Sequence, residues 1–204
     1  FLDRKAHTLW CGPFCISGTT LAGMGYVIRS VRADEWPAVK ELRLDSLRDP
    51  VAHLAFLETY EEAVARPDSF WEDRAAGAAE GETGAQQFVA EGSDGRWLGQ
   101  LVVLLEDAGT TDWAGFPVER RQGHIVGVYV RPEARGGELT KALFAAGLEW
   151  AWGAGAERVR LIVHEDNGRA QGLYRKVGFA PSGVRVSLPQ VPGESELEFV
   201  LERD

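Results

Sequence analysis

The residues best suited to bind an anion lie between positions 126 and 140. An apolar run leads into an Arg-Gly-Gly turn at residues 135–137, and helical periodicity begins at Leu139. The first turn of a helix carries backbone N–H groups without intrahelical partners, and the helix dipole adds positive potential there. Such a strand, glycine turn and helix often bind phosphate. The stretch therefore predicts a site for the pyrophosphate of a cofactor, with an ordinary strand–helix connection as the alternative.

A second stretch, at residues 167–179, reads Asn-Gly-Arg-Ala-Gln-Gly-Leu-Tyr-Arg-Lys-Val-Gly-Phe. Asn167 stands where a helix cap is expected, and Gly178 stands where that helix should end. This stretch and residues 128–144 resemble the two motifs of the GNAT family of N-acetyltransferases. These are a strand followed by Arg/Gln-x-x-Gly-x-Gly/Ala and a helix, and the pattern Asn-x-x-Ala-x-x-x-Tyr-x-x-x-Gly-Phe. The second pattern is the more specific, and the resemblance covers about residues 26–203.

The resemblance implies that the chain transfers an acetyl group from acetyl-CoA to an amine. The turn would then offer amides to the pyrophosphate, while the backbone at Val128 and Val130 would pair with the pantetheine arm. On a purely structural interpretation, the same positions are core residues and a helix cap. The residues expected at the cofactor are Val128, Tyr129, Val130, Arg135, Gly136, Gly137, Glu138, Leu139, Thr140, Lys141, Asn167, Ala170 and Tyr174.

The first motif departs from the family pattern at two positions. Glu138 and Thr140 stand where the family usually has Gly and Gly or Ala. Glycine lets a backbone approach a ligand closely, and a carboxylate would repel a pyrophosphate unless it turns outward to solvent. Gly136 and Gly137 can supply the backbone freedom one or two residues earlier. The departure leaves the fold prediction intact and puts the affinity for the cofactor in question.

Acetyl transfer also requires that the departing thiolate receive a proton. The resemblance implies that Tyr174 faces the cofactor sulfur as the general acid. A phenol, with an ordinary pKa near 10, is neutral at pH 7 and can donate a proton to a thiolate. The structural alternative is an aromatic residue packed on one face of its helix with Ala170 and Val177.

The general base that deprotonates the amine has three candidates. His124 lies near the start of the central strand, where many family members place a Glu that acts directly or through water, and the pKa of histidine suits this role. Glu106 ends the neighbouring strand and is the second candidate, and His164 is the third. For each of them a surface or core role is the alternative, and a chain of water molecules can replace a dedicated base.

The acceptor pocket should involve the early helices and the long loop after Glu106. Aromatic residues that could form its walls are Phe56, Tyr60, Phe70, Trp71 and Trp113. Carboxylates that could attract an amine are Asp45, Glu58, Glu61 and Asp112. The alternative is that the aromatic residues are core and the carboxylates are solvated, because helical spacing alone produces both patterns.

The elements that must position these residues alternate between strands and helices. Strands are predicted at residues 26–32, 87–92, 97–106, 124–130, 157–164, 184–188 and 196–201, and helices at 36–49, 53–65, 68–75, 139–153 and 167–177. Asp34 is expected to cap the first helix. The order predicts a mixed α/β (α+β) fold, with a mostly antiparallel sheet of about six or seven strands flanked by four or five helices.

The composition and length limit the partners, domain organisation and location that we expect for the chain. The chain has 204 residues and a formal net charge of −9, which argues against general nucleic-acid or anionic-membrane binding. Residues 1–25 fit no element, and we interpret them as a translation remnant or as an arm that packs on the partner in a homodimer. Residues 26–204 form the predicted catalytic domain. A cytoplasmic location is expected, because no apolar run could span a bilayer and the chain has two cysteines.

His7, Cys11 and Cys15 share a spacing that a helix would bring to one face, where they could hold a metal. Gly12 and Pro13 interrupt that helix, and a fourth ligand is not apparent, so no metal site is predicted.

The leading functional prediction is an acetyl-CoA-dependent N-acetyltransferase that acts on the primary amine of a small molecule by direct attack in a ternary complex. A peptide or protein N-terminus is the alternative acceptor. The competing class is a degenerate acyl-CoA-binding or interaction module without efficient catalysis, which the departure at Glu138 supports.

Overall fold

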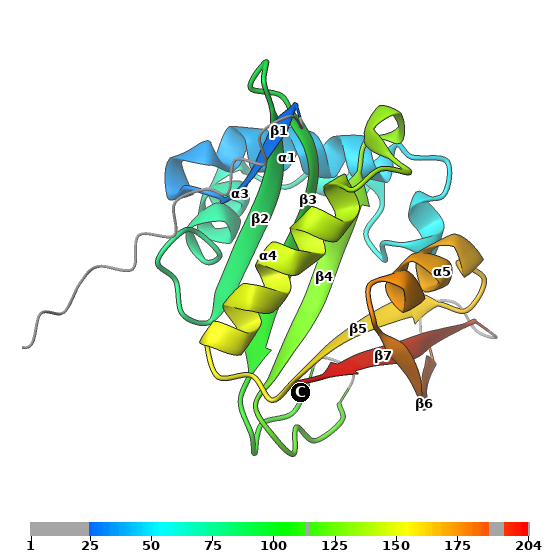
Figure 1. Cartoon of the computed structure of the whole chain (residues 1–204). Helices are drawn as coiled ribbons and strands as arrows, with labels where there is room; N and C mark the ends of the chain where they lie inside the picture. The colour runs from blue at the N-terminus through cyan, green and yellow to red at the C-terminus, as the bar shows by residue number, and fades with distance from the viewer. Residues whose placement is uncertain (1–24, 113–114, 188–193, 204) are drawn as a thin grey trace, which may run out of the picture.

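A single central sheet, with helices on both faces, forms the body of the molecule in a computed structural model (Figure 1). The structure describes residues 25–112, 115–187 and 194–203. The predicted amino-terminal extension lies outside the described residues except for Gly25, and so do His7, Cys11, Cys15 and Trp113.

Seven strands form the sheet in the order β1-β2-β3-β4-β5-β7-β6. Every neighbouring pair is antiparallel except β4 and β5, which are parallel. The predicted mixed, mostly antiparallel sheet is therefore confirmed. The strands are β1 (Tyr26–Ser30), β2 (Ala85–Gly92), β3 (Trp97–Glu106), β4 (Gln122–Val130), β5 (Arg158–His164), β6 (Ala180–Ser187) and β7 (Ser195–Glu202).

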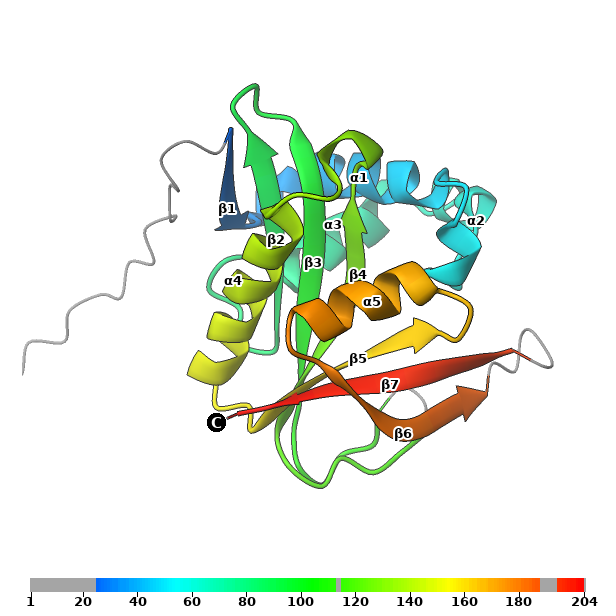
Figure 2. The same cartoon turned by 45° about the vertical axis from the view of Figure 1, so that its right-hand side comes forward.

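Helices cover the two faces of the sheet unequally (Figures 1 and 2). One hydrophobic cluster packs α1, α2 and α3 against one face, and a second packs α4 and α5 against the other. Side chains along β2 alternate between these clusters, because neighbouring residues of a strand point to opposite faces. The helices are α1 (Trp36–Leu47), α2 (Tyr60–Val64), α3 (Asp68–Ala76), α4 (Leu139–Gly153) and α5 (Gly168–Lys176).

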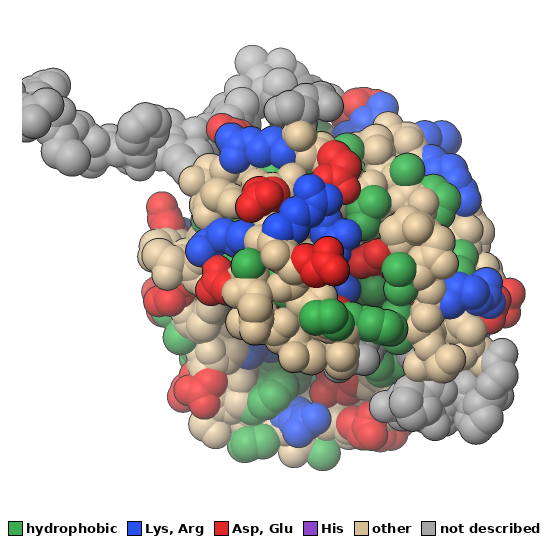
Figure 3. All heavy atoms as spheres, turned by 90° about the horizontal axis from the view of Figure 1, so that it is seen from below, with side chains coloured by type: hydrophobic (Ala, Val, Ile, Leu, Met, Phe, Trp, Pro, Cys, Tyr) green, Lys and Arg blue, Asp and Glu red, His purple; other side chains and the backbone are tan. Residues whose placement is uncertain are grey.

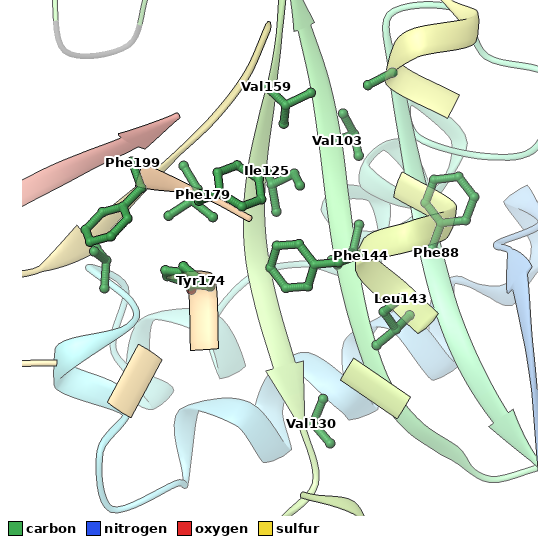
Figure 4. Packing of buried hydrophobic residues seen from close by; sticks show 14 of the residues in the cluster. Phe88, Val103, Ile125, Val130, Leu143, Phe144, Val159, Tyr174, Phe179 and Phe199 are labelled. Carbon is green, nitrogen blue, oxygen red and sulfur yellow. The ribbon is translucent and has the colours of Figure 1, made fainter. Parts of the chain in front are cut away.

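The core under α4 and α5 is built from interlocking aromatic rings (Figure 4). The Phe144 ring centroid lies 5.8 Å from that of Tyr174 and 5.9 Å from that of Phe179. Helix α4 packs closely on β3, since a Cβ at Gly147 would come within 2.9 Å of a Leu101 methyl group. These contacts hold the amino-terminal end of α4 and the Tyr174 side chain in a fixed relation.

The parallel strands β4 and β5 separate halfway along their length. They pair only from Gln122 to Ile125 of β4, and Figure 2 shows them diverging beyond that point. The pairing of β4 with β3 is also irregular there, where the register shifts between Gln100 and Val102 of β3. Gly127 has a φ of 63°, a left-handed conformation that glycine adopts without a Cβ penalty. The bulge and the separation together open a wedge in the sheet.

Local hydrogen bonding moved two of the predicted helix boundaries. The expected helix at residues 53–65 is instead a short 3-10 helix (Ala52–Leu54) followed by α2. Thr59 starts α2 through a capping box, because its hydroxyl accepts from the Glu62 N–H at 3.2 Å and the Glu62 carboxylate accepts from its N–H at 2.8 Å. The expected cap at Asp34 was also wrong. Glu35 holds the preceding 3-10 turn by accepting from the Arg32 N–H at 2.8 Å, and α1 begins after it.

The described part of the chain was also compared with the features of membrane-spanning helices and metal sites. No described helix is long and apolar enough to cross a bilayer, and no group of three or more potential metal ligands occurs in the described ranges. Acidic and basic side chains are interspersed with apolar ones on the face seen from below (Figure 3).

Candidate active site

A cavity of about 610 Å³ lies at the wedge between β4 and β5. Its walls come from the end of α1 and the segment after it, the end of β4, the turn before α4, and α5. All the residues expected at the cofactor line this cavity except Leu139, which is buried in the core under α4. Segments distant in sequence, among them the two motif stretches, therefore converge on one space.

The glycine turn presents unpaired backbone donors to this cavity. The amides of Gly136, Gly137 and Glu138 make no hydrogen bond to any described residue, and α4 begins directly after them. Gly136 has a φ of 83°, and a Cβ at either glycine would meet nothing within 4 Å. Free amides, an approachable backbone and a helix N-terminus are the features that accommodate a pyrophosphate.

Glu138 turns outward from the turn. Its side chain is 57% exposed, and its carboxylate lies 2.9 Å from the Lys141 ammonium. The negative charge that departs from the family motif is thus solvated and paired. Thr140, at the other departing position, is buried at 8% exposure.

Arg135 does not extend its side chain toward the mouth of the cavity. Its Nε donates to the Val130 carbonyl at 2.7 Å, and its guanidinium forms an ion pair with Asp49 at the end of α1. Burial raises the pKa of Asp49, but the hydrogen bonds from Arg135 and the Val51 N–H, together with the positive charge of Arg135, outweigh burial and lower that pKa. The charge of Arg135 therefore braces the turn against α1.

Two cations that sequence reasoning missed line the cavity on α5. Arg169 and Lys176 are exposed, and neither forms a salt bridge with a described residue. They are seven residues apart, which is two helical turns and places them on one face of α5. That spacing in the sequence could have identified them as a cationic pair on one helix face. These side chains can pair with phosphate groups.

Asn167 joins the two sides of the cavity. Its Oδ1 accepts from the Ala170 N–H at 3.1 Å, so it caps α5 as its position predicted. Its Nδ2 donates to the Leu54 carbonyl at 3.2 Å. The cap thereby ties α5 to the segment that follows α1.

Tyr174 combines a packed ring with a hydroxyl that has no hydrogen-bond partner among the described residues. The residue is 8% exposed and lines the cavity, while its ring contacts Phe144 and Phe199 (Figure 4). Burial raises the pKa of Tyr174 to about 12. The phenol is therefore neutral at neutral pH, and no described residue hydrogen-bonds its hydroxyl.

The structure distinguishes the first two candidate bases. His124 and Glu106 do not line the 610 Å³ cavity, and they contact each other, with His124 Nδ1 3.0 Å from a Glu106 oxygen. Glu106 also accepts from Gln122 at 2.6 Å and from Arg160 at 3.0 Å. Burial would raise the pKa of Glu106, but the hydrogen bonds from His124, Arg160 and Gln122 lower it to about 2. A carboxylate with this pKa is a weak base at neutral pH.

The third candidate, His164, has both ring nitrogens engaged. Its Nδ1 accepts from the Asp166 N–H at 3.1 Å, and its Nε2 lies 2.7 Å from the Glu194 carboxylate. His164 is 3% exposed and does not line the cavity. It has no free lone pair for an incoming proton.

The residues expected at the acceptor pocket separate into core and wall. Phe56 lines the cavity, whereas Trp71 is fully buried in the cluster under α1 and packs edge-on against Phe70. Three of the expected carboxylates are neutralised by arginines: Asp45 by Arg131 at 2.6 Å, Glu58 by Arg43 at 3.1 Å, and Asp112 by Arg160 at 2.8 Å. None of these three carboxylates lines the 610 Å³ cavity, so they do not form the acidic wall that the sequence indicated.

Comparison with known proteins identifies a family model and sequence relatives that match parts of this chain. A family model described as the acetyltransferase (GNAT) family matches residues 36–179, which is more than half of the chain. A mycothiol acetyltransferase from Saccharomonospora viridis is 40% identical over 92 residues, covering 45% of this chain and 29% of the relative. A putative [ribosomal protein bS18]-alanine N-acetyltransferase from Bacillus subtilis is 31% identical over 96 residues, covering 47% of this chain and 64% of the relative. The chain thus matches less than two thirds of either relative.

Solved structures share the fold at low sequence identity. A putative acetyltransferase from Salmonella typhimurium, solved with its cofactor acetyl-CoA, has a TM-score of 0.63 at 18% identity and covers 89% of this chain and 95% of its own. An N-acetyltransferase from Thermoplasma acidophilum in complex with coenzyme A has a TM-score of 0.63 at 15% identity, covering 86% and 98% of the two chains.

Proposed function

This chain belongs to the acetyltransferase (GNAT) family, and we propose that it is an acetyl-CoA-dependent N-acetyltransferase acting on the primary amine of a small molecule. One observation supports placing this reaction in the 610 Å³ cavity. The amides of the 136–138 turn, the capping Asn167 and the hydroxyl of Tyr174 come from separate elements and border the same cavity. The amides and the hydroxyl make no hydrogen bond within the described ranges. Direct attack of the amine on the thioester in a ternary complex needs both substrates in one such space.

Acetyl-CoA supplies the activated acetyl group as a thioester. The turn amides and the start of α4 hold its pyrophosphate, and Arg169 and Lys176 provide positive charge at the mouth of the cavity. The edge of β4 that faces β5 has no strand partner beyond Ile125, which leaves the backbone at Val128 open to a ligand. The Val130 carbonyl already accepts from Arg135 and contributes less.

The proton donor and the proton acceptor lie toward opposite faces of the sheet. Tyr174 belongs to the cluster under α4 and α5, and its hydroxyl protonates the departing thiolate. Ile125 points to that same cluster, so His124, the preceding residue on the strand, points to the face covered by α1. His124 does not line the cavity, so the proton of the amine reaches it through water.

A specific observation supports each of two alternatives, a peptide acceptor and a degenerate binding module. The relative named a [ribosomal protein bS18]-alanine N-acetyltransferase supports a peptide N-terminus as the acceptor, whereas the relatives named mycothiol acetyltransferases support a small molecule. The degenerate binding module is supported by Glu138 in the cofactor turn, although that carboxylate points to solvent and pairs with Lys141.

Calorimetry of the full chain with acetyl-CoA tests the cofactor assignment. We expect binding by the unchanged chain, and we expect Glu138→Gly to change the dissociation constant by about fivefold or less, because an exposed charge contributes under about 1 kcal/mol. Binding that appears only in the Glu138→Gly variant would favour the degenerate module. Absence of binding in both proteins would remove the cofactor assignment.

An acceptor screen tests the substrate class. Release of free thiol from acetyl-CoA is measured with a panel of small primary amines and with short peptides that begin with alanine. Thiol release with small amines and not with peptides is expected. The reverse pattern would transfer the proposal to a peptide N-terminus.

A further inference from the structure

Two histidines on neighbouring strands each pair with a glutamate, but through opposite ring nitrogens. His124 of β4 faces Glu106 through Nδ1, at 3.0 Å. His164 of β5 faces Glu194 through Nε2, at 2.7 Å. Which nitrogen is paired decides which one can accept a proton, because a neutral imidazole has one N–H and one lone pair.

The partners of Glu106 determine the tautomer of His124. An ionised carboxylate only accepts hydrogen bonds, so the Nδ1 atom that faces it must carry the hydrogen. Glu106 is kept ionised by Gln122 and Arg160, whose donors lie 2.6 and 3.0 Å from its oxygens. The lone pair of the neutral His124 ring is therefore on Nε2, and no described residue hydrogen-bonds that atom.

Arg160 holds the carboxylate in place. Its Nε and Nη2 donate to the two oxygens of Glu106 at 3.1 and 3.0 Å, a two-point contact that prevents the carboxylate from rotating away. Arg160 is itself held by Asp112 at 2.8 Å and by Glu198 at 3.5 Å. Arg158 faces Glu198 at 4.0 Å. Arg160 Nη2 also lies 3.5 Å from His124 Nδ1, but the Glu106 oxygen at 3.0 Å is the nearer partner of that nitrogen. The charged groups around His124 thus come from β3, β5, β7 and the loop before β4.

We propose that Glu106 is a positioning residue, which holds His124 in the Nδ1–H tautomer so that Nε2 accepts the proton of the acceptor amine through water. The inference rests on the proposed acetyl transfer and gives Glu106 a different role from that of a base. As the amine nitrogen forms its bond to the acetyl carbon, its N–H bond breaks and an Nε2–H bond forms. Nδ1 keeps its hydrogen, and the imidazolium later returns a proton to solvent.

His164 supplies a matched control within the same chain. It has the same residue pair and the same depth of burial, at 3% exposure against 2% for His124. Its Nδ1 is occupied by the Asp166 N–H and its Nε2 by Glu194, so removing the glutamate charge does not affect a proton acceptor. The two glutamates differ in exposure, at 13% for Glu106 and 45% for Glu194, so the control is matched at the histidine. A general effect of removing the glutamate charge beside a buried histidine would appear at both sites.

The tautomer is measured directly by nitrogen NMR of the unliganded chain at a pH where both rings are neutral. We expect the Nδ1–H form at His124 and the Nε2–H form at His164. An Nε2–H tautomer at His124 overturns the proposal. This measurement needs no turnover and no variant, so it separates failure of the positioning role from failure of the proposed function, which would appear as absent thiol release with every amine.

Glu106→Gln, compared with Glu194→Gln, tests the consequence for the reaction. We expect Glu106→Gln to lower kcat about 100-fold and to abolish the acidic limb of the pH–rate profile, with the KM for acetyl-CoA changed less than about threefold. We expect Glu194→Gln to leave both unchanged. In a His124→Ala background, Glu106→Gln should cause no further loss, because the two residues act as one unit. A lower rate with an unaltered acidic limb, or an additional loss in that background, would show that Glu106 is only structural.

Discussion

Tyr174 shows at the scale of one residue how burial keeps a phenol protonated. The aromatic core around Phe144 and Phe199 removes water from the ring and raises the pKa of the phenol to about 12. A group with this pKa stays protonated across the working range of an enzyme. Because an ordinary thiol has a pKa of about 8.5, complete transfer of this proton to a thiolate is uphill, and the phenol acts first as a hydrogen-bond donor to the sulfur. The same burial makes the side chain part of the core, so its packing role is confirmed, and its role as the general acid stays a prediction.

Tyr174→Phe should therefore lower kcat about 100-fold with little change in acetyl-CoA affinity. Stability should change by less than about 1 kcal/mol, since the hydroxyl has no hydrogen-bond partner among the described residues. Because the pKa is raised to about 12, we expect no alkaline limb from this group below about pH 11. Steady-state rates and calorimetry across pH measure these quantities. Tyr60→Phe, outside the cavity lining, is the control, and equal kcat in the Tyr174→Phe variant would contradict the acid role.

At the scale of elements, the bulge in β4 creates the wedge that holds the cavity. Gly127 adopts a left-handed φ of 63°, and β4 loses its pairing with β5 after Ile125. Side-chain patterns predicted a strand here without the bulge, because the run from Ile125 to Val130 is apolar throughout. The bulge becomes visible only in the shifted register against β3.

Gly127→Ala should destabilise the chain by about 1–2 kcal/mol, because a Cβ is disfavoured in the left-handed region. The cost is expected from the backbone alone, since the nearest atom to the new Cβ is a Val102 methyl group at 3.9 Å, an ordinary contact. Denaturant unfolding measures the change. Gly153→Ala at the end of α4 is the control, with no atom within 4 Å of the new Cβ, and it should be neutral or slightly stabilising. Similar losses in both variants would contradict a special role for the bulge.

At the scale of the whole molecule, two ion pairs lock α1 onto the end of β4 and the turn beyond it. Arg131 pairs with Asp45 at 2.6 Å, and Arg135 pairs with Asp49. The paired residues are 86 positions apart in the chain, so these contacts join the acceptor wall to the cofactor turn. The turn keeps its shape through a contact with another layer of the fold.

Asp49→Asn should cost about 2 kcal/mol of unfolding free energy, somewhat less than a fully buried pair, because Arg135 is partly exposed. Thermal or denaturant unfolding of the full chain measures it. The exposed pair of Arg96 and Glu133 offers the control, and Glu133→Gln should change stability by about 0.5 kcal/mol or less. If Asp49→Asn and Glu133→Gln lowered the free energy of unfolding equally, the ion pair of Arg135 and Asp49 would contribute no more than a surface ion pair.

The sequence by itself determined the features that depend on interactions between residues close together in the chain. The strand, glycine turn and helix at residues 126–140, the cap at Asn167 and the end of α5 at Gly178 follow from backbone hydrogen bonds and helix periodicity. The mixed sheet follows from the order of these elements. Local rules also gave the wrong cap at Asp34 and merged two helices after α1, where Glu35 and Thr59 form competing hydrogen bonds.

Only the tertiary structure decided which polar groups meet. The sequence ranked His124, Glu106 and His164 as first, second and third candidates for the base, but no local pattern shows what each side chain contacts. Their partners distinguish these candidates, and those partners come from other strands of the sheet and from the loop before β7. A histidine can accept a proton only at a nitrogen left free, and which nitrogen is free depends on contacts between segments far apart in the chain.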